Sequence, residues 1–104
     1  MEKKLVALLM FGGLLVHSTT FAAGGEELFK AKACVACHNL NMKLVGPAFQ
    51  DVAGKYAGQA DAVDHLATSI KKGSQGIWGP IPMPPNAVTE EEAKTIAEWI
   101  VTLK

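Results

Sequence analysis

The chain has 104 residues, with ten lysines, no arginine and ten acidic residues, so its formal net charge is zero. A chain of this length holds one small domain, and the balanced charge excludes the strongly basic face of a typical nucleic-acid binder. Its two cysteines are too few for a disulfide framework or for a zinc site built from paired cysteine motifs.

Residues 1–22 have the three-part pattern of a secretory signal peptide. A charged start over residues 1–4 precedes an apolar run over residues 5–16, and small or polar residues follow up to Ala22. The apolar run is shorter than the roughly 18 to 20 residues that a transmembrane helix needs, so a retained anchor is the weaker interpretation. We expect cleavage after Ala22, which leaves a mature domain of residues 23–104 in the bacterial periplasm.

The first predicted helix begins near Glu26, where acidic residues favour a helix N-terminus, and it is expected to run into residues 34–38. This segment reads Cys34-Val35-Ala36-Cys37-His38, and Cys-x-x-Cys-His is the attachment signature of c-type haem. Cysteines three apart share one face of a helix, so both thiols can reach the vinyl groups along one porphyrin edge. His38 is then carried beneath the iron as a neutral nitrogen ligand. The alternative is a local disulfide between Cys34 and Cys37, which an oxidising compartment allows, but the adjoining His38 favours haem.

Two further helices are expected in the middle of the chain. Pro47 opens a short helix whose apolar residues recur at helical spacing up to Tyr56. Asp61 is expected to cap the next helix, which ends at Lys72 and Gly73 with cations in its last turn.

Residues 73–86 contain four of the five prolines, so they are expected to form an ordered irregular loop. The last helix has Thr89 as its N-cap and Glu92 as the second member of a capping box. Its buried residues recur at helical spacing as far as Leu103. The pattern contains no convincing strand, so the predicted fold is all-α, with three to four helices wrapped around one covalently attached haem.

The mature chain offers three candidates for the iron position opposite His38. Met42 lies only four residues after His38, at most ~14 Å of extended chain, which is too short to round the porphyrin edge. His65 is interpreted as a solvated surface side chain. Met83 stands between Pro82 and Pro84 in the loop, which could hold a thioether over the ring, so Met83 is the predicted sixth ligand.

A methionine and a histidine on iron predict an electron carrier. A neutral thioether raises the reduction potential relative to a second imidazole, and two protein ligands leave no position for a substrate. The sequence also lacks a nucleophile with a histidine–carboxylate pattern, so we do not expect an enzyme. Two alternatives remain, which are a five-coordinate iron that reacts with small ligands and a haem-bearing subunit of a membrane complex. Binding of carbon monoxide tests the first alternative, and gel filtration tests the second.

The sequence resembles the small bacterial class I cytochromes c of the cytochrome c-551 type, over essentially all of residues 23–104. The resemblance is carried by residues 34–38, by Val45-Gly46-Pro47-Ala48 and above all by the loop from Gly73 to Val88. It implies a periplasmic single-electron carrier between membrane respiratory complexes and a soluble nitrite reductase or terminal oxidase. It also implies the site residues and their roles: thioethers from Cys34 and Cys37, iron ligands His38 and Met83, a Pro47 carbonyl that accepts from His38, and a Trp78 indole that donates to a haem propionate.

One residue departs from the related cytochromes. Relatives often place an arginine before the isoleucine here written Ile70, and this chain has Ser69. For Trp78 the alternative interpretation is a core aromatic, whereas Phe29, Phe49 and Trp99 are expected to pack in the core.

Partner binding and folding can also be anticipated. We expect a monomer that docks transiently through the exposed haem edge, with a rim drawn from four lysines: Lys30, Lys32, Lys43 and Lys71. Because so small a domain has a thin core, we expect the haem-free chain to be largely unfolded.

Overall fold

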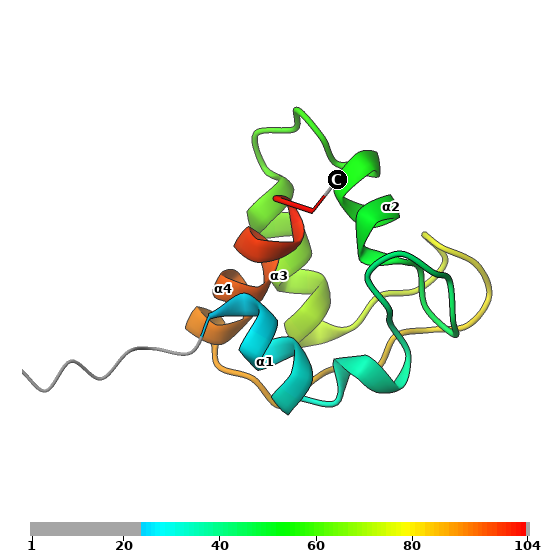
Figure 1. Ribbon diagram of the computed structural model, residues 1–104, viewed down its shortest axis with the longest axis horizontal. Coiled ribbons are helices and arrows are strands. Elements are labelled where there is room, and N and C mark those ends of the chain that lie inside the picture. The colour runs from blue at the N-terminus through cyan, green and yellow to red at the C-terminus, as the bar shows by residue number, and fades with distance from the viewer. Residues whose placement is uncertain (1–23, 104) are drawn as a thin grey trace, which may run out of the picture.

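The computed structural model describes residues 24–103, and the predicted signal peptide lies outside the described residues. It contains four α-helices and one 3-10 turn (Figure 1), which are α1 (Gly25–Ala31), η1 (Cys34–Ala36), α2 (Phe49–Lys55), α3 (Ala62–Lys72) and α4 (Glu90–Ile100). Over the described residues the only β-type pairing is an isolated bridge between Ser74 and Met83. The prediction of an all-α fold is therefore confirmed. None of the helices within residues 24–103 has both the length and the apolar character needed to cross a membrane.

The first helix does not run into the haem motif, and that prediction was wrong. α1 ends at Ala31, and Ala33 adopts a left-handed conformation with φ of 70°, which an α-helix cannot accommodate. The cysteines follow in the separate turn η1, where the backbone N–H groups of Cys37 and His38 both donate to the Cys34 carbonyl, at 3.1 and 2.9 Å.

The middle helices begin close to their expected positions. α2 starts two residues after Pro47, and α3 follows Asp61. Asp61 is the N-cap residue of α3 as predicted, but its side chain accepts no capping hydrogen bond. α3 ends as predicted at Gly73, whose φ of 92° is accessible mainly to glycine.

The last helix has the predicted capping box. The Glu92 backbone N–H donates to Thr89 Oγ1 at 3.0 Å, and the Thr89 backbone N–H donates to Glu92 Oε1 at 3.0 Å. The helix ends at Ile100, so the expected extension to Leu103 was wrong by one short turn.

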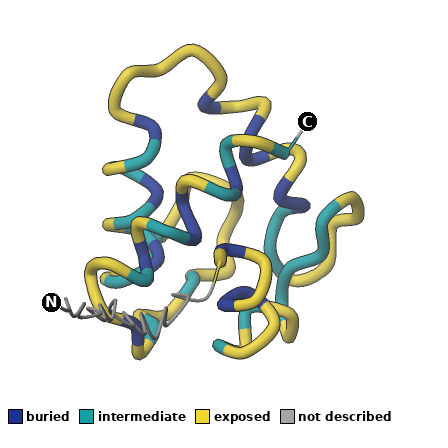
Figure 2. The backbone as a smooth tube through the Cα atoms, turned by 60° about the vertical axis from the view of Figure 1, so that its left-hand side comes forward, coloured by how far each residue is buried: buried dark blue, intermediate teal, exposed yellow. Residues whose placement is uncertain are grey.

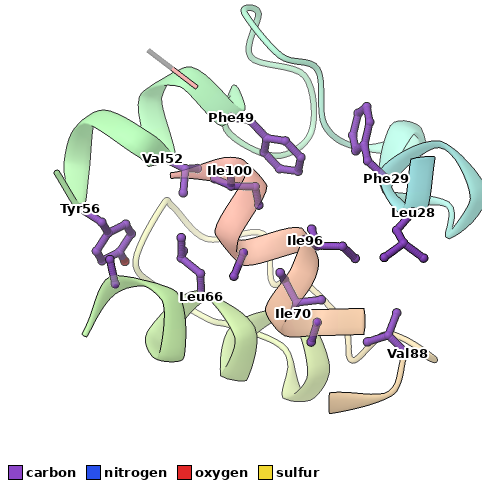
Figure 3. Close-up of a cluster of buried hydrophobic side chains, with 13 residues drawn as sticks. Leu28, Phe29, Phe49, Val52, Tyr56, Leu66, Ile70, Val88, Ile96 and Ile100 are labelled. Carbon is purple, nitrogen blue, oxygen red and sulfur yellow. The ribbon is translucent and has the colours of Figure 1, made fainter. Parts of the chain in front are cut away.

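α4 is the centre of the core because α1, α2 and α3 all pack against it. Its residues Ile96 and Ala97 are 1% and 0% exposed, and side chains from the other helices converge on it (Figure 3). Each helix keeps one buried side, whereas the loops between them are largely exposed (Figure 2). The rings of Phe29 and Phe49 lie 5.1 Å apart, and Trp99 lies 5.5 Å from Phe29, which confirms the predicted aromatic packing.

Candidate functional site

All six predicted site residues line one cavity of about 530 Å³. A cavity of this size is typical of small-molecule and cofactor sites. Its walls come from η1, α2, α3, α4 and the two loops over residues 43–47 and 74–84, and they are mainly apolar. The predicted site residues on these walls are Cys34, Cys37, His38, Pro47, Trp78 and Met83.

The two cysteines are free and half-buried. The structure therefore does not support the alternative of a Cys34–Cys37 disulfide. Burial raises the pKa of the Cys34 thiol, and a backbone hydrogen bond that lowers this pKa offsets the increase only in part. Cys34 is thus held as a thiol at the cavity wall, where it can form a covalent bond to a group in the cavity.

His38 is oriented by a hydrogen bond to the next loop. Its Nδ1 lies 2.8 Å from the Pro47 carbonyl oxygen, and since a carbonyl oxygen can only accept, Nδ1 carries the proton and donates. The other nitrogen, Nε2, then keeps a free lone pair and can bind a metal. The Phe49 ring lies beside the imidazole, with centroids 4.8 Å apart.

Gly46 belongs to a segment that carried the resemblance, but the sequence reasoning gave it no role in the site. A Cβ at this position would lie 2.5 Å from His38 Cε1 and 2.8 Å from Nδ1, so only glycine allows the loop to approach the imidazole this closely. The Gly46 backbone N–H also donates to the Cys37 carbonyl at 2.8 Å. The signal was present in the sequence as a glycine directly before Pro47.

Met83 is half-buried and is held by hydrogen bonds between the two ends of its loop. The Met83 N–H donates to the Ser74 carbonyl at 2.8 Å, and the Ser74 N–H donates to the Met83 carbonyl at 3.0 Å. Beyond Met83, Nδ2 of Asn86 donates to the Ile70 carbonyl at 2.8 Å, which ties the loop to α3. Ser74 and Asn86 are therefore supporting residues that sequence reasoning missed, although asparagine at the end of a turn is a known signal for such bonds.

The other two candidate ligands lie elsewhere. Met42 is 57% exposed and does not line the cavity. His65 is half-buried, and its Nε2 lies 3.0 Å from the Tyr56 hydroxyl, so its interpretation as a solvated side chain was wrong. Burial raises the pKa of Tyr56, which keeps the hydroxyl protonated beside the imidazole.

Trp78 stands at the rim of the cavity. Its side chain is among the exposed hydrophobic residues, 38% accessible, so the alternative of a core aromatic was wrong. Ser69 also lines the cavity, at the position where an arginine was expected from the resemblance. The polar lining on this side is therefore largely uncharged.

Three of the four lysines of the expected docking rim pair with glutamates. Lys30 lies 3.4 Å from Glu26, Lys32 lies 3.5 Å from Glu92, and Lys71 lies 3.9 Å from Glu90. Within residues 24–103, Lys43 is the one lysine that lines the cavity.

The donor set fits a haem and does not fit a metal bound by side chains alone. Within the described part of the chain, no three histidine, cysteine or acidic side chains come close enough to hold a metal ion. An apolar cavity with two thiols on one wall, an oriented imidazole and a thioether suits a macrocycle that brings its own four nitrogens.

Comparisons with known proteins agree with this geometry. The family model of cytochrome c matches residues 22–104. The chain is 75% identical to cytochrome c-551 of Pseudomonas denitrificans over 80 residues, which is 77% of this chain and 98% of the relative. It is 57% identical to cytochrome c-551 of Stutzerimonas stutzeri over the full length of both chains.

Solved structures show the same fold. The crystal structure of wild-type Nitrosomonas europaea cytochrome c552 is 52% identical in sequence and superimposes with a TM-score of 0.74, over 76% of this chain and 99% of that one. The prediction of a class I cytochrome c fold is thereby confirmed. The chain belongs to the cytochrome c family, as a small bacterial class I member of the cytochrome c-551 type that carries electrons through one covalently attached haem c.

Proposed function

We propose that Cys34 and Cys37 attach the haem and that His38 and Met83 are its two axial ligands. When bound, the haem supplies a one-electron couple between ferric and ferrous iron. The observation that carries this proposal is that the segment 34–38 and the distant loop with Met83 line a single cavity, in which His38 is already oriented by Pro47. The thioether and imidazole would fill both axial positions, so this function is electron transfer and not catalysis.

The chain's own residues keep these ligands in place. The 2.8 Å hydrogen bond to Pro47 fixes the tautomer of His38 and strengthens it as a ligand. The paired hydrogen bonds between Ser74 and Met83 hold the thioether-bearing loop. Ligands that are held in one geometry move little between oxidation states, and this lowers the reorganisation that each electron transfer requires.

The ligand assignment is tested by the optical spectrum of the oxidised protein. Methionine on ferric haem gives a weak sulfur-to-iron band in the near-red, and we expect Met83→Ala to abolish it. Met42→Ala is the matched control, because Met42 is exposed and outside the cavity, and it is expected to keep the band. Persistence of the band in Met83→Ala, or its loss in Met42→Ala, would contradict the assignment. Rapid carbon monoxide binding by the ferrous parent would favour a five-coordinate iron instead.

The cellular setting is part of the same proposal. We infer that residues 1–22 are removed as a signal peptide and that the mature protein, residues 23–104, is a periplasmic monomer. Its donor would be a membrane cytochrome complex, and its acceptor a nitrite reductase or a terminal oxidase. The similarity to cytochromes c-551 supports this assignment. Mass spectrometry of the exported protein tests it, because an N-terminus other than Ala23 would refute the cleavage site.

Docking to these partners is proposed to use the mouth of the cavity. Exposed apolar side chains lie around it, among them Val45, Ile77 and Ile81, which are 53%, 42% and 64% exposed. Because Lys30, Lys32 and Lys71 have glutamate partners, we expect Lys43 to contribute most of the salt-dependent steering. Lys43→Gln should weaken the salt dependence of the rate of partner reduction more than Lys30→Gln does, and equal effects would refute this rim.

A further inference from the structure

Lys55 differs from the other lysines in the position of its ammonium group. It is the last residue of α2 and lies between the cavity-lining residues Val52 and Tyr56. Its Nζ is 5.4 Å from the ring centroid of Trp78, which lines the cavity from the loop over residues 74–84. The contact therefore brings a positive charge to the rim of the cavity, between α2 and the loop.

The other cations near the cavity have different surroundings from Lys55. The chain has no arginine, and Lys71, at the end of α3, pairs with Glu90 at 3.9 Å. Lys43 lines the cavity from the loop that approaches His38. Among residues 24–103, no carboxylate lies within 4.0 Å of Lys55.

Haem c brings two carboxylates that need compensation. These propionates lie on the edge of the ring opposite to the thioether bonds. In the structure α2 ends on the side of the molecule away from η1, which carries the cysteines (Figure 1). The polar side chains that line the cavity from α3 and the start of the next loop, Ser69 and Ser74, carry no positive charge. A carboxylate at the edge of an apolar cavity is costly unless a cation or donors meet it.

We propose that the Lys55 ammonium, which lies over the Trp78 ring, offsets the charge of a haem propionate. This inference rests on the haem site proposed above. A cation near the ring disfavours the more positive ferric state, so Lys55 raises the reduction potential. It also favours the ionised form of the propionate and lowers the pKa of that group.

Lys55→Met in the haem-loaded protein tests the proposal. We expect the equilibrium constant for electron exchange with a mediator of fixed potential to shift about threefold toward the oxidised cytochrome, which is ~30 mV for a one-electron couple. The pKa of the propionate, followed through the pH dependence of the potential, should rise. Lys55→Arg should behave like the parent. Lys94→Met is the control, because Lys94 is an exposed lysine of α4 outside the cavity lining and its loss changes the net charge equally.

Three results would overturn the proposal. Equal shifts in Lys55→Met and Lys94→Met would show a general charge effect, and a full shift in Lys43→Met alone would assign the role to Lys43. A crystal structure of the haem-loaded parent with the Lys55 ammonium more than ~6 Å from both propionates would also refute it, whatever the variants do. The near-red sulfur band distinguishes failure of this inference from failure of the ligand assignment. If the parent has the band and Lys55→Met leaves the reduction potential unchanged, only the inference about Lys55 fails.

Discussion

The packing of α1 against α4 gives a quantitative prediction that depends on a single hydrogen atom at Gly25. A Cβ at Gly25 would lie 2.8 Å from Trp99 Cγ and 3.0 Å from the Thr95 carbonyl oxygen, and it would also clash with Trp99 Cβ. These atoms belong to the backbone or to the base of a side chain, so they cannot move without separating the two helices. Overpacking of this kind costs about 1–3 kcal/mol, so we expect Gly25→Ala to lower the melting temperature by roughly 4–24 °C.

The matched control is the same substitution in α2. A Cβ at Gly54 meets nothing within 4 Å, and Gly54 is exposed inside a helix. Alanine there removes the conformational freedom of glycine and should stabilise the protein by about 0.5–1 kcal/mol. Both effects can be read from thermal unfolding of the haem-loaded protein, followed by far-ultraviolet circular dichroism. If Gly25→Ala melts at or above the parent while Gly54→Ala behaves as expected, the argument from close helix packing is wrong.

Three further changes have defined outcomes. Gly46→Ala should push a Cβ into the His38 ring, at 2.5 Å from Cε1. We expect this variant to be less stable by about 1–3 kcal/mol and to have an altered haem spectrum. An unchanged spectrum and melting temperature would contradict the close approach of Gly46 to His38. Thr89→Ala removes the side-chain cap of α4 and should cost about 1 kcal/mol in chemical denaturation, whereas no loss would mean that the capping box contributes little. The hydrogen bond from the Thr89 backbone N–H, more than any other interaction, holds the pKa of Glu92 below its usual value of 4.5. The ionised Glu92 carboxylate therefore stabilises the fold above its pKa in the unfolded chain, and this stabilisation is lost as the pH falls through the lower pKa of the folded protein. Glu92→Gln should thus flatten the decline of stability below pH 4.5. A parallel decline in the parent and the variant would refute the assignment.

Signals confined to a few neighbouring residues predicted most of the site. The Cys-x-x-Cys-His spacing and the prolines around Met83 each indicate a specific function, and the structure brings the corresponding residues together at the cavity. The capping box at Thr89 was equally local, and it was confirmed at the start of α4. The break between α1 and the motif has no such signal. It occurs at Ala33, a residue that favours helix, in a left-handed conformation, so tertiary packing must have overridden local preference there.

Other predictions failed because they depended on contacts between residues that are distant in sequence. His65 was interpreted as solvated because it lies beside Asp64 and away from the apolar stripe of its helix, whereas its partner Tyr56 comes from the end of α2. The close approaches at Gly25 and Gly46 also depend on how separate segments cross. A glycine in a sequence shows that a side chain is absent, but only the assembled fold shows what occupies the space.

Part of the hydrophobic core also lines the candidate haem site. Tyr56, Leu66, Ile70 and Ile96 are each less than 9% exposed and yet also line the cavity. One face of each therefore packs against helices while the other faces the cavity proposed to hold the haem. The haem thus completes the hydrophobic core of a domain that is too small to build a large one from its own residues, and this sharing is the physical reason to expect that the haem-free chain is largely unfolded. It also explains why residues far from the iron, such as Gly25 at the α1–α4 crossing, should influence the stability of the site.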